Sequence, residues 1–174
     1  MSDGTIEQRD GTVIFRYERL LPHPVGVVWT AITEPDEIER WTVSRPEIDL
    51  RPGGRYVTRH RGGEQVTDRI TRLEPPRLFE HTFWVHINPT ALVTWELSPA
   101  NGGCRLVLTH RLDLDDVRAA TTIAGDDLTT IMSRNGAGWH RLLDLLGGTL
   151  DGRPAPWTEQ DQRALRERYA AMLG

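Results

Sequence analysis

The feature that most constrains the fold is a change of hydrophobic period along the chain. Residues 45–112 divide into short segments that alternate apolar and polar positions and are separated by turns rich in Gly and Pro. Residues 127–150 instead carry apolar side chains at helical spacing, which predicts one long amphipathic helix. One helix cannot fully bury a strongly curved sheet, so this pattern predicts an α+β fold with a cavity between the two.

The expected elements follow from these periods and from the turn signals between them. About seven strands are expected, at residues 13–21, 45–50, 55–61, 65–73, 77–85, 91–97 and 104–112. Helices are expected at residues 24–33, 36–41, 127–150 and 159–173, with Thr158 as the N-cap of the last one. The pattern of residues 115–126 is ambiguous and fits a short helix and a loop. The result is a helix-grip fold, in which a curved antiparallel sheet of about six to seven strands wraps around the long C-terminal helix.

The length of 174 residues suits a single domain. We expect residues 1–11 to form a flexible tail, residues 12–150 to form the domain and residues 151–174 to form an extension with a short helix. Two roles are open for the arm at residues 154–157, which could fold back over the cavity mouth or serve a homodimer contact.

Composition excludes several classes of function. The formal net charge of −4 disfavours nucleic-acid binding. The sequence has neither an apolar signal region at its start nor an apolar run that could span a membrane. We therefore expect a cytoplasmic protein. All 21 basic residues are arginine, which excludes Schiff-base chemistry on lysine. The single cysteine, Cys104, excludes an internal disulfide framework. No metal-ligand spacing, phosphate loop or dinucleotide fingerprint is present, so no metal or cofactor is expected.

Strand parity indicates which polar side chains enter the interior. Residues 104–112 place His110 on the same face as three leucines, at positions 106, 108 and 112. On residues 91–97 the inner set contains Trp95. On residues 77–85 either alternating set could face inward, so the interior receives Glu80 or His81.

The long helix buries Trp139 and Leu143, with His140 at the border of its apolar stripe. Trp41 and Trp84 are candidate walls or lids of the cavity. The full set of candidate ligand-binding residues is Trp41, Tyr56, Glu80, His81, Trp84, Trp95, His110, Trp139, His140 and Leu143. The competing interpretation is that His110 and His140 are core histidines that bridge sheet and helix, and that the tryptophans only pack.

Several segments, taken in order, resemble one protein family. They are residues 24–35 (PVGVVWTAITEP), 50–56 (LRPGGRY), 73–78 (LEPPRL), 94–97 (TWEL), 105–110 (RLVLTH) and 138–140 (GWH). This set is similar to the SRPBCC proteins, specifically to bacterial homologues of the heat-shock-protein-90 ATPase activator. The resemblance covers about residues 12–150 and implies the helix-grip fold.

The resemblance also implies classes of function. Related START and birch-pollen-allergen domains bind lipids, sterols and polyketides, so the first hypothesis is a non-catalytic module that binds a hydrophobic or aromatic small molecule. The second is an enzyme of the polyketide cyclase or aromatase type, with His110 or His140 as base. The third is a chaperone-related or stress-regulatory module with a protein partner.

Overall fold

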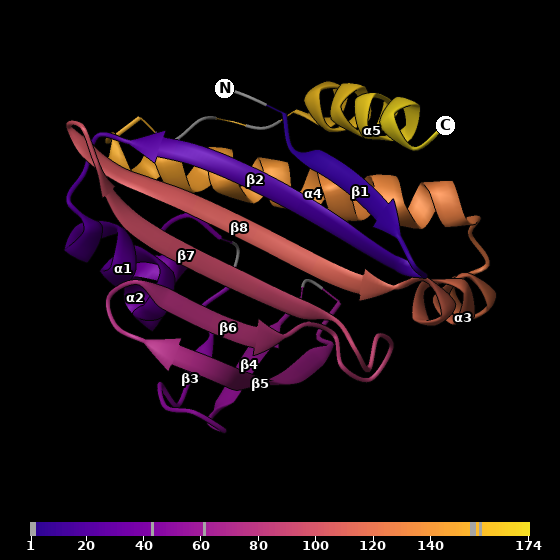
Figure 1. Ribbon diagram of the computed structural model, residues 1–174, viewed down its shortest axis with the longest axis horizontal. Coiled ribbons are helices and arrows are strands. Elements are labelled where there is room, and N and C mark those ends of the chain that lie inside the picture. The colour runs from indigo at the N-terminus through magenta and orange to yellow at the C-terminus, as the bar shows by residue number, and fades with distance from the viewer. Residues whose placement is uncertain (1–2, 43, 61, 154–155, 157) are drawn as a thin grey trace.

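The computed structural model describes residues 3–42, 44–60, 62–153, 156 and 158–174. One antiparallel sheet dominates it, and the long helix α4 (Leu128–Leu150) lies against its concave side (Figure 1). The eight strands run in the order β1-β2-β8-β7-β6-β5-β4-β3. They are β1 (Thr5–Arg9), β2 (Thr12–Leu21), β3 (Glu47–Ile48), β4 (Arg55–Arg59), β5 (Gln65–Glu74), β6 (Leu78–Thr82), β7 (Leu92–Ala100) and β8 (Gly103–Asp113). The other helices are α1 (Val25–Thr33), α2 (Pro35–Glu39), α3 (Leu114–Ala124) and α5 (Glu159–Leu173).

The α+β helix-grip fold is confirmed, with one strand more than expected. Residues 1–11 are not a loose tail throughout, because Thr5–Arg9 form β1 and pair with β2. The turn between the two strands is Asp10-Gly11, and both residues have positive φ, 50° and 77°. Asp-Gly is a strong signal for a two-residue hairpin, so the turn chemistry explains why the chain folds back here.

Residues 115–126, for which the sequence indicates a short helix and a loop, are helical as far as Ala124. Asp113 caps the first turn of α3 by accepting a hydrogen bond from the backbone N–H of Asp115, and Gly125 ends the helix with φ 71°. Thr158 is confirmed as the N-cap of α5, where it forms a reciprocal capping box with Asp161. Three of the four residues in the arm 154–157 lie outside the described part of the chain, so neither role suggested for it is addressed.

Strand β6 ends at Thr82, three residues before the expected end at Val85. Trp84 adopts φ 53°, a left-handed conformation that a strand cannot contain. The backbone N–H groups of Trp84 and Val85 donate to the carboxylate of Asp68 instead of to a neighbouring strand. A side chain on β5 therefore fixes the turn that follows β6.

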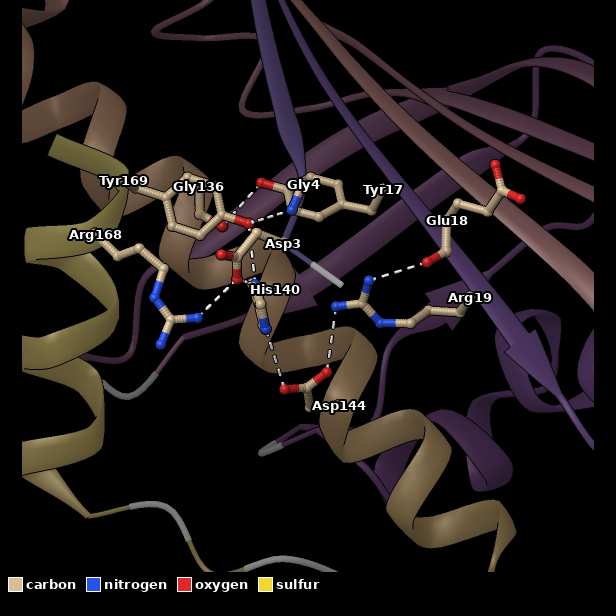
Figure 2. A network of polar contacts seen from close by, with 10 residues as sticks. All are labelled: Asp3, Gly4, Tyr17, Glu18, Arg19, Gly136, His140, Asp144, Arg168 and Tyr169. Carbon is tan, nitrogen blue, oxygen red and sulfur yellow. Dashed lines mark hydrogen bonds and ion pairs between the residues drawn. The ribbon is translucent and has the colours of Figure 1, made fainter. Parts of the chain in front are cut away.

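The C-terminal helix α5 lies beside α4 and is fixed to it by one tyrosine (Figure 2). The hydroxyl of Tyr169 accepts a hydrogen bond from the backbone N–H of Gly4 at 2.9 Å and lies 3.0 Å from Nδ1 of His140. Its ring packs on the backbone of Gly136, where a Cβ atom would come within 2.5 Å of it.

None of the described helices is both long and apolar enough to cross a bilayer.

We predict opposite effects from two alanine substitutions on α4. Gly136→Ala should lower the free energy of unfolding by about 1–3 kcal/mol, because the new methyl group would overlap the ring of Tyr169. Gly138→Ala is the matched control. A Cβ atom there meets open space, so the higher helix propensity of alanine should leave stability equal or raise it by up to about 1 kcal/mol. Urea denaturation followed by circular dichroism measures both, and equal destabilisation by the two would contradict the close packing at Gly136.

Candidate functional site

A cavity of about 420 Å³ lies between α4 and strands β4–β7. Its walls are rich in aromatic side chains from five different parts of the chain: Trp41, Tyr56, Phe83, Trp95 and Trp139. Leu142 and Leu145 line it from α4, one helical turn apart. The polar lining includes His81 and Asp68. The site is thus mostly apolar with a few fixed polar groups, as in small-molecule pockets in general.

Strand register brings the inner-face residues into one row across the sheet. His81 on β6 faces Ile70 on β5 and Val93 on β7, and Val93 in turn faces His110 on β8. Because directly paired residues point to the same face, His81 and not Glu80 enters the interior. Glu80 lies on the other face, where its carboxylate accepts hydrogen bonds from the hydroxyls of Thr71 at 2.8 Å and Thr94 at 2.9 Å.

His81 has both ring nitrogens engaged. Its Nδ1 lies 2.6 Å from the carbonyl oxygen of Thr82, to which only an N–H can donate. Its Nε2 accepts the indole N–H of Trp95 at 3.3 Å. Burial lowers the pKa of His81, so the ring is neutral and this tautomer satisfies both contacts.

Asp68 is a buried carboxylate in the cavity wall that the sequence analysis did not identify. It is 3% exposed and accepts hydrogen bonds from the hydroxyl of Thr82 and the backbone N–H groups of Trp84 and Val85. The signal that could have revealed it is parity, since it lies between Val66 and Ile70 on the inward face of β5. Burial, together with the negative charge of Asp68, raises the pKa of the neighbouring Tyr56.

His110 is fully buried behind the aromatic wall and does not line this cavity. Its Nδ1 accepts the indole N–H of Trp139 at 2.9 Å, so the ring proton is on Nε2, which has no hydrogen-bond partner among the described residues. The ring packs against Phe83, with centroids 5.1 Å apart. Burial, aided by the nearby His81, lowers the pKa of His110 from 6.5 to about 3.

The remaining candidates lie elsewhere. Trp84 is outside the first cavity. Its ring stacks on His86 with centroids 5.5 Å apart and contacts the tilted ring of His60 at 4.7 Å. It lines a second cavity of about 430 Å³ between α3, α4 and the turn after β6. Leu143 is buried in the core and does not line either cavity.

His140 does not line the cavity and lies where α4 meets Tyr169 of α5 (Figure 2). Its Nε2 lies 3.3 Å from a carboxylate oxygen of Asp144, and Asp144 also pairs with the buried Arg19 at 3.2 Å. Its other ring nitrogen contacts Tyr169. His110 and His140, the two histidines considered as catalytic bases, are therefore separated. Five of the ten candidates line the first cavity: Trp41, Tyr56, His81, Trp95 and Trp139.

Comparison with known proteins identifies the family. Residues 22–151 match the model for "Activator of Hsp90 ATPase homolog 1-like protein". The chain belongs to this family. No curated protein matches this member of the activator homolog 1-like family.

Several solved structures are similar to it over nearly their whole length. CalU16 from Micromonospora echinospora is 26% identical, with a TM-score of 0.70 over 98% of this chain and 95% of CalU16. The protein encoded by BPP1335 from Bordetella parapertussis is also 26% identical, with a TM-score of 0.65 over 97% of this chain and 89% of its own. EF2215 from Enterococcus faecalis, described as a conserved protein of unknown function, is 20% identical with a TM-score of 0.77 over 98% and 90% of the two chains, which shows the fold alone.

The site has no recognisable metal centre. Across the described residues, no three side chains of His, Cys, Asp or Glu gather closely enough to hold a metal ion.

We predict that His110 makes the stability of the protein fall in mild acid. The unfolded chain takes up a proton on this residue near pH 6.5, whereas the folded protein does so only near pH 3, so stability present at neutral pH is lost as the pH falls between these values. At pH 5 the loss attributable to His110 should be about 2 kcal/mol relative to pH 7.5. Urea denaturation at both pH values measures it.

The variant that tests this is His110→Gln, whose amide oxygen can still accept from Trp139. Between pH 7.5 and pH 5, the free energy of unfolding of this variant should fall by about 2 kcal/mol less than that of the wild type. His86→Gln, on an exposed residue, is the control and should keep the wild-type pH dependence. Identical slopes for His110→Gln and the wild type would show that His110 does not titrate on unfolding.

Proposed function

We propose that this protein is a non-catalytic binding module for a hydrophobic or aromatic small molecule, held in the cavity between α4 and the sheet. The observation that carries the proposal is the aromatic lining of a cavity of about 420 Å³, built from helix, strand and turn residues together. Small-molecule sites commonly enclose about 300–1,000 Å³ and are lined mainly by apolar and aromatic groups. Membership of the family supports a ligand-binding role for the fold.

The state of the polar groups favours binding over proton transfer. A general base needs a free lone pair within reach of its substrate. Both nitrogens of His81 are engaged with protein partners, and the carboxylate of Asp68 already accepts three hydrogen bonds. The cyclase alternative would use His110 or His140 as the base, and neither of them lines the cavity. The expected cytoplasmic location and any homodimer or protein partner stay predictions.

Ligand binding should be visible with the fluorescent probe N-phenyl-1-naphthylamine. Three of the six tryptophans line the cavity, so saturable probe binding should quench tryptophan emission as it enhances the probe's own. Leu142→Arg should weaken probe binding at least about tenfold, because it places a charge in an apolar site. The matched control is Leu20→Arg, on a residue 71% exposed and outside both cavities, which should bind as the wild type does.

Native mass spectrometry of the freshly purified protein gives a second readout. A small molecule carried through purification and lost on denaturation would support the proposal and reveal its chemical class. No saturable binding of the probe, together with no displacement by a panel of lipids and aromatic compounds, would reject it.

A further inference from the structure

The two cavities described above lie end to end along one face of α4. Four residues line both of them: Phe83, Gly138, Trp139 and Leu142. The shared residues form the junction between a first cavity of about 420 Å³ and a second of about 430 Å³. Because each of these residues borders both cavities, the boundary between the two spaces is about one residue thick.

The lining residues of α4 form one continuous stripe. Ile131 and Asn135 line the second cavity, Gly138 and Leu142 line both, and Leu145 lines the first. These positions are three or four residues apart and therefore share one helical face. The distance along the helix from residue 131 to residue 145 is about 21 Å, at 1.5 Å per residue.

Gly138 lies in the middle of this stripe and has no packing reason to be glycine. A Cβ atom built on it meets nothing within 4 Å, whereas one on Gly136 would overlap Tyr169. A glycine in the middle of a helix destabilises it relative to alanine. At this position the missing side chain leaves open space beside the boundary between the two cavities.

We propose that the two cavities act as a single channel joined beside Gly138, and that the ligand is one elongated, flexible, apolar molecule that lies along α4 through the junction. This inference rests on the proposed function and names its ligand class. Phe83 forms the wall facing the helix at the junction, where its ring lies 5.0 Å from Trp139. The carboxylate of Asp68 positions Phe83, because it fixes the backbone of the next two residues.

The test is displacement of bound N-phenyl-1-naphthylamine by straight-chain alcohols from 1-octanol to 1-tetradecanol. If the channel is continuous, affinity should keep rising along the series, by up to about fourfold per methylene group. Gly138→Leu should reduce the ratio of tetradecanol to octanol affinity at least about tenfold, since its side chain fills the junction. Gly138→Ala should fall between the two.

The control is Ala171→Leu, which adds the same bulk to an exposed position on α5 outside both cavities and should leave the whole series unchanged. Unfolding midpoints of all variants establish that they fold. A wild-type series that stops rising at 1-octanol, or a Gly138→Leu series identical to the wild type, would overturn the channel while probe binding itself still supports the proposed function. If neither the probe nor any alcohol binds, the proposed function fails and the channel fails with it.

Discussion

The structure depends on the difference in width between one long helix and the much wider sheet that it covers. Eight strands at about 4.8 Å spacing are far wider than a helix of about 10–12 Å diameter. A single α4 can therefore cover only the middle of the concave face. The chain closes the remainder with α1 and α2 near one end and α3 near the other (Figure 1). Large aromatic side chains fill much of the core between sheet and helices. What these do not fill is the pair of cavities along α4.

Aromatic side chains fill much of this space, but each buried tryptophan brings an indole N–H that requires a hydrogen-bond acceptor. Two neutral histidines supply it, in one cross-strand row on either side of Val93. Trp95 donates to His81 and Trp139 donates to His110. Neutral imidazole suits this role because it can accept on one nitrogen and adapt its tautomer to the other contact. Burial that disfavours a charged ring thus keeps both histidines available as acceptors.

Much of this arrangement could be predicted from periodicity, and the exceptions have identifiable causes. Alternation along β8 was enough to place His110 inside, because a strand has only two faces. His140 could not be assigned in this way, because α5 covers a second side of α4 and creates a buried face that the sequence pattern does not separate from the cavity face. Asp68 was missed although its place between Val66 and Ile70 indicates the inner face, because a carboxylate adds no apolar signal of its own. Its partners are Thr82 and backbone groups of a turn that only the folded chain defines.

The hydroxyl of Tyr169 has a consequence for how the protein opens. It binds Gly4, 165 residues away in the sequence, and His140 in the middle of α4, so one atom joins the start of the described chain, its last helix and the central helix (Figure 2). Local unfolding proceeds in cooperative units defined by such shared contacts. We therefore expect β1 and α5 to open as one such unit, because the Tyr169 hydroxyl joins the residue before β1 to α5 and to α4. Strand β2 does not belong to this unit, since it is paired along its whole length with β8 and its inward side chains are buried.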